Sequence, residues 1–373
     1  MIKLLIGGSP CTFWSIAQKN GRETEAEGMG WELFKNYLIA KEKFQPDFFL
    51  YENNKSAAQP IKDQISRELG VDLMHINSAL VSAQNRQRFY AFNWTVDQPE
   101  DRGIVLRDIL EPCTLEQTYE MQSVGIGYRN RREDDGKLYR RYETSGEPKS
   151  NALTTVQTDY MEAEPVRIGD IGSTAQAHRV YSCDGKSVTI NAGGGGQGGK
   201  TGLYMCPTKD QSIKNLYEVR NGQIEINGRT YPIRLADGYY IIRKLTPTEC
   251  ERLQTLPDGY TKAVSNAQRY KGLGNGWTAE IIIHIMNGAL KDIPRDEEIV
   301  VLSMYDGIGT GRYCLDKMGF TNVRYYAYEI DKHAMQVALS NYPDIIHCGD
   351  AFDLRKPDWT IEGLSKETCQ LSC

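Results

Sequence analysis

A short apolar run followed at once by a glycine-rich turn opens the chain and constrains its fold most. Residues 2–6 are apolar except for Lys3, and Gly7-Gly8-Ser9-Pro10-Cys11 comes directly after them. Such a run predicts a buried strand, and the turns at the carboxyl ends of strands hold the active sites of open α/β sheets. Cys11 is therefore a candidate nucleophile, and a helix starting just behind it would favour the thiolate. Most cysteines are inert small hydrophobes, so this position alone leaves both interpretations open.

Composition limits the class of protein. The 373 residues suffice for roughly two domains. No apolar run approaches the roughly 18 residues that a membrane span needs, and the start of the chain has no secretory pattern. Nine cysteines without a Cys-x-x-Cys pair, and only five histidines, argue against a zinc site and against a disulfide framework. We therefore expect no metal, no membrane and a reducing cytoplasm.

Two α/β regions flank a β-rich middle. Strand signals at 48–51 and 72–76 enclose a helical pattern at 56–69, and a second set has strands at 299–304 and 323–328. This alternation predicts an α/β fold with a parallel sheet. Between them, glycine, serine, threonine and short β-branched runs predict a separate β and loop-rich region, which ends near a helix with Thr246 as its N-cap. We place the boundaries at 1–98, 99–258 and 259–373.

A glycine-rich turn near the C-terminus is typical of a nucleotide pocket. Gly307-Ile308-Gly309-Thr310-Gly311 follows Tyr305-Asp306 at the end of a strand, in the strand, turn, helix order of Rossmann-type sheets. Glu329 ends the next strand, where a carboxylate can accept two ribose hydroxyls. Asp350 is a candidate for an adenine amino group. The alternative is a tight strand-to-helix turn with exposed carboxylates.

Two polar clusters complete the N-terminal region. Glu52 ends the second strand, where a carboxyl group in a partly closed pocket can act as an acid; a helix cap or a solvated loop acid is the alternative. The alternation in residues 84–90 would place Gln84, Arg86 and Arg88 on one face of a strand, although a surface strand also explains it. A second basic run, at 129–141, is interrupted by three acids, so a solvated loop explains it as well.

Together these segments resemble the DNA cytosine-5 methyltransferases over nearly the whole chain. The residues that carry the resemblance are Gly7 to Cys11, Glu52-Asn53, Gln84-x-Arg86-x-Arg88, Arg243 to Thr246 with Glu249, Gly274 to Trp277, Asp306 to Gly309, Glu329 to Asp331, and Gly349-Asp350. Thr12 and Asn54 depart from the family's usual residues. The family's order begins with the cofactor motifs, so here the order is rotated. A circular permutation accounts for this, because chain ends usually lie at the surface and close together.

The resemblance implies a fold, domains and a reaction. The fold would be a circularly permuted Rossmann-like methyltransferase sheet, with 1–98 as its catalytic half, 259–373 as its cofactor half and 99–258 as a target-recognition domain. A cytosine leaves the DNA stack to be reached, and Cys11 attacks its ring carbon 6. Glu52 holds ring nitrogen 3 and the amino group, while Arg88, supported by Arg86, holds the 2-oxo group. Carbon 5 then takes a methyl group from S-adenosylmethionine.

The resemblance also implies binding residues. For the cofactor they are Pro10, Tyr305, Asp306, Gly307, Ile308, Gly309, Thr310, Gly311, Glu329, Ile330, Asp350, Asn275 and Trp277, the last two on the methionine side. For DNA they are Ser15, Gln84, Gln176, Arg179, Thr189, Gly194 and Gly195. Gln176 would fill the space of the flipped base, Arg179 would read a guanine edge, and the glycines would let backbone approach DNA. A flexible linker is the alternative for the glycine run.

The net charge of −5 argues against an overall basic surface but permits a local basic cleft. The expected partner is double-stranded DNA, a cognate restriction endonuclease is a candidate second partner, and the expected state is a monomer in the cytoplasm of a bacterial or phage-infected cell. Three alternatives remain: the same reaction on transfer RNA, a non-catalytic DNA-binding accessory subunit, and a nicotinamide dehydrogenase built on Gly307 to Gly311. The last ignores every motif N-terminal to it.

Overall fold

The computed structural model of the chain describes residues 1–15, 21–111, 126–132, 138–144, 165–173, 176–192, 199–208 and 216–361. At 126–132, at 138–144 and at Gln176, the backbone alone is described. The chain divides into two compact units. The first, called the catalytic unit below, comprises Met1–Asn77, Gln87–Gln98 and Gly259–Cys373. The second, called the β unit, comprises Ser78–Arg86 and Pro99–Asp258.

The catalytic unit is built on a seven-stranded sheet in the order β16-β15-β14-β1-β2-β4-β3. Its strands are β1 (Ile2–Gly7), β2 (Phe48–Asn54), β3 (Met74–Asn77), β4 (Gln87–Phe92), β14 (Ile299–Met304), β15 (Val323–Tyr328) and β16 (Ile346–Gly349). The strands from β16 to β2 run parallel, so their carboxyl ends share one edge.

Strand β4 differs from the expected parallel sheet. It pairs antiparallel with both β2 and β3, so the sheet is mixed. It also begins only at Gln87, so Gln84 and Arg86 precede the strand instead of sharing a face with Arg88. The prediction of one strand through residues 84–90 is therefore wrong. An alternating pattern cannot locate the start of a strand, because that depends on which partner supplies the hydrogen bonds.

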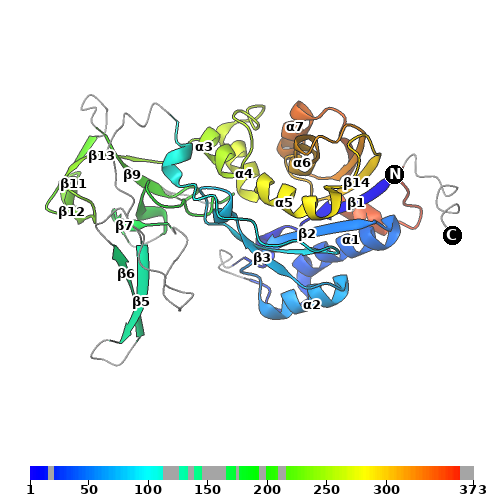
Figure 1. Cartoon of the computed structure of the whole chain (residues 1–373), viewed down its shortest axis with the longest axis horizontal. Coiled ribbons are helices and arrows are strands. Elements are labelled where there is room, and N and C mark those ends of the chain that lie inside the picture. The colour runs from blue at the N-terminus through cyan, green and yellow to red at the C-terminus, as the bar shows by residue number, and fades with distance from the viewer. Residues whose placement is uncertain are drawn as a thin grey trace. The chain divides into compact units, whose positions relative to one another are not determined.

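Helices cover both faces of this sheet (Figure 1). They are α1 (Gly28–Phe44), α2 (Gln59–Leu69), α4 (Asn266–Asn275), α5 (Ala279–Leu290), α6 (Thr310–Lys317) and α7 (Lys332–Asn341). Helices α1 and α2 bury Phe34, Tyr37 and Ile61 in one core with Leu5 and Leu302 from the strands. All six residues of β14 are buried, as expected for a central parallel strand. Burial on this scale holds the strand ends, and hence the turns that follow them, in fixed positions.

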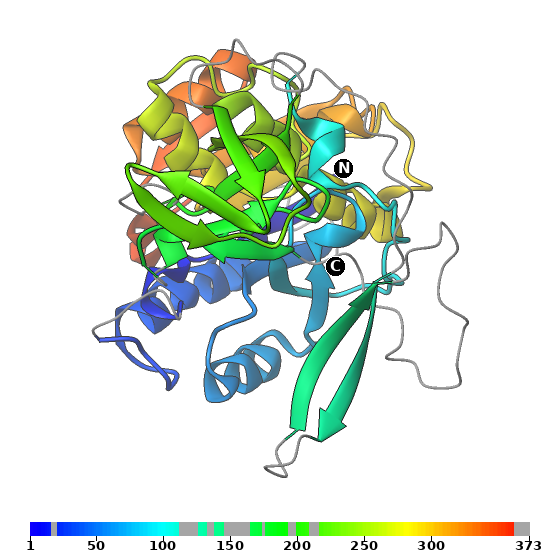
Figure 2. The same ribbon diagram turned by 90° about the vertical axis from the view of Figure 1, so that its left-hand side faces the viewer.

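The β unit contains a second seven-stranded sheet, seen in Figure 2, in the order β12-β11-β10-β13-β9-β8-β7. Its strands are β7 (Arg167–Asp170), β8 (Arg179–Ser182), β9 (Leu203–Pro207), β10 (Leu216–Arg220), β11 (Gln223–Ile226), β12 (Arg229–Pro232) and β13 (Gly238–Arg243). A separate hairpin pairs β5 (Ile126–Arg132) with β6 (Leu138–Thr144). Alternate strand residues such as Leu203, Met205 and Val219 build the core of the seven-stranded sheet.

Short helices complete the description. The 3₁₀ helices are η1 (Cys11–Phe13), η2 (Ser78–Leu80), η3 (Leu106–Ile109), η5 (Gln176–His178) and η6 (Ala351–Arg355). In the described part of the β unit, α3 (Pro247–Leu253) is the one α-helix. Thr246 caps it as predicted, accepting the Glu249 N–H, while the Glu249 side chain accepts the Thr246 N–H. Among the described residues, no helix has the length and apolar character to cross a membrane.

Candidate active site

The nucleophile candidate lies in the turn that follows β1. Cys11 is free, partly exposed and the first residue of η1. Its carbonyl accepts the N–H groups of Trp14 at 3.1 Å and Ser15 at 2.9 Å. The first α-helix of the described chain begins only at Gly28, so the prediction of a helix starting just behind Cys11 is wrong. A single 3₁₀ turn offers little of the aligned dipole that would favour a thiolate.

Partly buried polar contacts hold the Cys11 turn in place. Trp14 is buried and its indole N–H donates to Glu23 Oε2 at 3.0 Å. The same carboxylate accepts the N–H of Gly30 at 3.1 Å, in the first turn of α1, where a negative charge is favourable. Arg22 donates to the carbonyls of Trp14 and Ser56. The Cys11 turn is thus attached to α1 and to the connection after β2.

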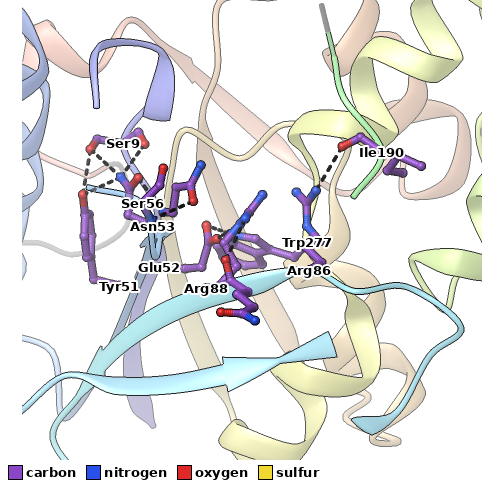
Figure 3. A network of polar contacts seen from close by, with 11 residues as sticks. Ser9, Tyr51, Glu52, Asn53, Ser56, Arg86, Arg88, Ile190 and Trp277 are labelled. Carbon is purple, nitrogen blue, oxygen red and sulfur yellow. Dashed lines mark hydrogen bonds and ion pairs between the residues drawn. The ribbon is translucent and has the colours of Figure 1, made fainter. Parts of the chain in front are cut away.

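A second network fixes the residues just before the nucleophile (Figure 3). Asn53 is buried, and its Nδ2 donates to the Ser9 carbonyl at 2.9 Å and to the Tyr51 hydroxyl at 3.0 Å. The Ser9 and Tyr51 hydroxyls share a hydrogen bond at 2.7 Å. Ser9 and Asn53 were not predicted as site residues, although Asn53 stands next to Glu52 in the motif. Their side chains set the path of the backbone into Pro10 and Cys11.

Gly8 brings this turn against Glu52. A Cβ atom at Gly8 would lie 2.5 Å from the Glu52 carbonyl oxygen and 3.0 Å from its Oε2. Distances this short exclude any larger residue. The absence of a side chain at Gly8 therefore explains how the Cys11 turn and the Glu52 carboxylate come to occupy the same edge of the sheet.

Both oxygens of Glu52 have donors. Arg88 Nε lies 2.9 Å from Oε1, and Trp277 Nε1 donates to Oε2 at 3.0 Å (Figure 3). Register explains the ion pair, because Glu52 stands opposite Tyr90 and Arg88 is the diagonal neighbour on β4. The side chains of Glu52 and Arg88 are only 12% and 11% exposed. A thiol and a carboxyl group at one strand edge are the components of covalent catalysis assisted by an acid or base.

The cofactor-side turn begins at the carboxyl end of β14. Tyr305 adopts a left-handed backbone with φ of 59°, which is uncommon for a residue with a side chain. Its hydroxyl donates to the Leu33 carbonyl at 2.8 Å and accepts from Asn36 at 3.2 Å. Asp306 Oδ1 accepts the hydroxyls of Ser303 at 2.7 Å and Tyr325 at 2.6 Å. Burial raises the pKa of Asp306 despite these two hydrogen bonds.

Glu329 lies at the carboxyl end of the neighbouring strand β15. Its Oε2 accepts the N–H of Gly307 at 2.9 Å, and its Oε1 accepts those of Ile330 and Asp331 at 2.8 Å. Burial raises the pKa of Glu329, and the three N–H groups oppose that shift. The carboxylate therefore connects the glycine turn after β14 with the end of β15. Two exposed apolar side chains, Ile330 and Phe352, follow β15 and β16. Phe352 was not predicted, although it stands only two residues after Asp350.

The remaining cofactor-side predictions fall on varied positions. Ile308 and Thr310 are buried, Pro10, Asn275 and Asp350 are exposed, and Gly309 is the N-cap of α6. At Gly311 a Cβ atom would lie 2.4 Å from both Ile6 Cδ1 and the Tyr325 hydroxyl. Helix packing against the sheet therefore accounts for the glycine at 311 without reference to a ligand.

Six of the seven residues predicted to contact DNA lie in the β unit. Arg86, which was predicted as a catalytic residue, also lies in the β unit, and its Nη1 donates to the Ile190 carbonyl at 3.4 Å (Figure 3). Thr189 donates to the Asn85 carbonyl at 2.5 Å. Gln84 is fully buried, with no hydrogen-bond partner for its amide among the described residues. Arg179 starts β8 and is partly buried. The Gln176 side chain, Gly194 and Gly195 lie outside the described residues, and Ser15, in the catalytic unit, is partly exposed.

Comparison with known proteins identifies the family. The profile of the C-5 cytosine-specific DNA methylases matches residues 1–291. The chain belongs to the C-5 cytosine-specific DNA methylase family. As a family member it is a DNA cytosine-5 methyltransferase, an enzyme whose substrate is DNA. This assignment excludes the dehydrogenase alternative, and the family description favours DNA over transfer RNA as the substrate.

Three relatives of this DNA methylase come from two bacteria and a phage. Type II methyltransferase M.HhaI of Haemophilus parahaemolyticus is 29% identical over 137 residues, which cover 37% of this chain and 32% of the relative. Orphan methyltransferase M.SPRI of Bacillus phage SPR is 25% identical over 361 residues, covering 75% of this chain and 80% of the relative. Type II methyltransferase M.HpaII of Haemophilus parainfluenzae is 26% identical over 293 residues, which cover 73% of this chain and 67% of the relative.

Proposed function

We propose that this methylase transfers a methyl group to carbon 5 of a flipped-out cytosine in a specific DNA sequence, through a covalent adduct at Cys11. One observation carries the proposal. The turn bearing Cys11 lies, through Gly8, against a carboxylate whose two oxygens are held by Arg88 and Trp277. A base inserted at this edge would meet a nucleophile, a carboxyl group and a guanidinium together.

Each side chain has a role in the reaction. The Cys11 sulfur attacks ring carbon 6, and a proton shared between Glu52 and ring nitrogen 3 makes the ring a better electrophile. Glu52 also accepts from the exocyclic amino group, and Arg88 donates to the 2-oxo group. The attack places negative charge at carbon 5, which becomes nucleophilic. Loss of the carbon 5 proton after methylation then allows elimination, which breaks the bond to sulfur and frees Cys11.

The carboxyl ends of β14, β15 and β16 offer a site that fits S-adenosylmethionine. Glu329 supplies a carboxylate for ribose hydroxyls, and the exposed apolar faces of Ile330 and Phe352 suit an adenine ring. Asp350 accepts the Phe352 N–H through Oδ1, which leaves Oδ2 for the adenine amino group. Bound S-adenosylmethionine supplies the electrophilic methyl group. The chain's own residues bind it, orient it and keep its methyl group near the target carbon.

The fold is a circular permutation of the family's usual order. The first strand of the chain, β1, is central and lies between β14 and β2. At the end of α1, Lys43 donates to the carbonyls of Leu354 and Lys356, while the adjacent Phe44 carbonyl accepts from Lys3 Nζ. The segment after β16 therefore reaches the edge where β1 begins. This supports a join at that edge in the usual order.

Residues 99–258, which make up most of the β unit, form the target-recognition domain. The enzyme works as a monomer on double-stranded DNA in the cytoplasm of a bacterial or phage-infected cell. The separate sheet of the β unit supports a reading role, and membership in the C-5 cytosine-specific DNA methylase family supports the DNA substrate. A cognate restriction endonuclease is the natural partner if the enzyme protects a restriction site.

Two measurements test the function. Bisulfite sequencing of DNA from cells that express the chain should reveal 5-methylcytosine within one short sequence. DNA of that sequence carrying 5-fluorocytosine should trap the protein covalently in the presence of S-adenosylmethionine. With fluorine at carbon 5 there is no proton to remove, so the elimination that frees Cys11 cannot occur. Cys11→Ser should abolish both signals while DNA and cofactor binding remain. Substantial turnover by Cys11→Ser would overturn the covalent mechanism.

A further inference from the structure

A single hydrogen bond joins a segment that the proposed mechanism assigns to the cofactor with a residue that it assigns to the target base. The indole Nε1 of Trp277 donates to Glu52 Oε2 at 3.0 Å (Figure 3). The motif at Gly274 to Trp277 predicts a place on the methionine side of the cofactor, whereas Glu52 faces the target base. The tryptophan side chain therefore has a polar contact on the base side that its motif does not predict.

The contact restricts how Glu52 can be oriented. An indole N–H is a donor only, so it binds a lone pair of Oε2 and cannot take up a proton. Arg88 binds the other oxygen, and its guanidinium is itself oriented by a hydrogen bond from Nη1 to the Gln87 carbonyl at 2.9 Å. With one donor on each oxygen, rotation of the carboxyl plane would break a hydrogen bond to a largely buried group, which is costly.

Trp277 is itself held firmly. It lies in the short connection between α4 and α5, where the Gly276 N–H donates to the Gly272 carbonyl at 2.8 Å. On its other side, Thr278 is buried and is the N-cap residue of α5. The backbone on both sides of Trp277 is therefore held by helix ends, so Trp277 can transmit the position of the helices to the carboxylate.

We propose that Trp277 is a positioning residue for Glu52, fixing the plane in which the carboxyl group meets ring nitrogen 3 and the amino group of the target cytosine. The inference rests on the proposed function and deepens it. It makes the connection between α4 and α5 part of the base-binding pocket. A misoriented carboxyl group would slow attack by Cys11 without weakening DNA or cofactor binding.

Trp277→Phe tests the proposal, because it removes the N–H and keeps an aromatic ring. Loss of a hydrogen bond to a charged group is worth about 1.5–3 kcal/mol, so we expect adduct formation with 5-fluorocytosine DNA to slow by about 10-fold to 100-fold. The dissociation constants for DNA and for S-adenosylmethionine should stay within about twofold. Trp94→Phe is the matched control, since its indole donates at 2.8 Å to the Ile285 carbonyl; its adduct rate should equal that of the wild type.

A double-mutant cycle separates a role through Glu52 from any other. In a Glu52→Gln background, Trp277→Phe should cause little further loss, because the group it positions is already changed. A full additional loss in that background would overturn the proposal. So would weaker cofactor binding with an unchanged adduct rate, which would leave Trp277 a cofactor-lining residue only.

Nuclear magnetic resonance tests the contact without turnover. The chain has five tryptophans, and Trp277→Phe identifies the indole N–H signal that disappears. That signal should move in Glu52→Gln, whereas the Trp94 signal should not. An unmoved Trp277 signal would overturn the inference whatever the activity. If the Trp277 signal moves in Glu52→Gln but the wild-type protein forms no adduct, the result would instead count against the proposed function.

Discussion

Two carboxyl groups flank the strand that leads to Cys11, and their surroundings differ sharply. Strand β1 pairs with β2 on one side and with β14 on the other. Glu52 lies near the carboxyl end of β2 and receives a guanidinium and an indole N–H. Asp306 follows β14 and receives two hydroxyl groups on one oxygen, while its Oδ2 has no partner among the described residues.

The difference shows that position at a strand end does not by itself set the surroundings of an acid. A guanidinium partner stabilises a negative charge beside the nucleophile turn, and a substrate can replace one donor with another. Two buried hydroxyls instead hold Asp306 as a structural link between β14 and β15, and burial raises its pKa. The two acids therefore differ in the chemistry of their partners.

Of the substitutions that test this comparison, Glu52→Gln should have the largest effect, which is on the rate of methylation. The substitution keeps the shape of the side chain but removes its charge and its ability to exchange a proton with ring nitrogen 3. General acid–base assistance is typically worth about 10²-fold to 10⁴-fold, so single-turnover methylation should fall within that range with DNA binding retained. Glu68→Gln, at an exposed site on α2, is the control and should match the wild type. A fall of less than about tenfold in Glu52→Gln would remove the distinction between the two acids.

An intermediate effect is expected at Glu329. Its raised pKa means that it takes up a proton at a higher pH than an ordinary glutamate. A protonated carboxyl group accepts ribose hydroxyls less well, so S-adenosylmethionine affinity should fall several-fold as the pH is lowered through that pKa. Calorimetric titrations from about pH 4, near the ordinary pKa of glutamate, up to about pH 8 would measure it. Glu329→Gln should bind more weakly and without this pH dependence; a parallel pH dependence in the variant would assign the titration to another group.

The smallest effect should be on stability, at Asp306. Because its pKa is raised in the folded protein, the stabilising contribution of its proton is fully present below the unfolded pKa and is lost as the pH rises through the folded value. Asp306→Asn does not lose that contribution, so its melting temperature should exceed that of the wild type at pH 8, by about 2–4 °C for each kcal/mol relieved in a unit of this size.

This advantage should shrink as the pH falls and Asp306 takes up its proton. Asp63→Asn, at an exposed position on α2, is the matched control and should show no such trend. A lower melting temperature for Asp306→Asn at pH 8 would mean that the charged carboxylate stabilises the fold, which would make Asp306 resemble Glu52.

Local sequence patterns predicted much of the catalytic unit. The runs at 48–51, 299–304 and 323–328 are strands of one sheet, because continuous apolar runs bounded by turns fit a sheet that is buried on both faces. The Thr246 cap was predicted because it depends on residues three apart. The helix behind Cys11 and the strand through Gln84 were predicted wrongly, since both depend on packing partners distant in sequence.

The sequence by itself determined the family, the types of reactive group and the strand ends that carry them, because motifs and apolar periodicity are local properties of a chain. Only the tertiary structure decided which donors hold each carboxyl group. Glu52 and Trp277 are separated by 225 positions, and β4 supplies Arg88 through an antiparallel register that its own sequence does not specify. Such contacts arise when helices and strands pack their apolar faces together, and side-chain order alone does not encode which polar atoms then meet.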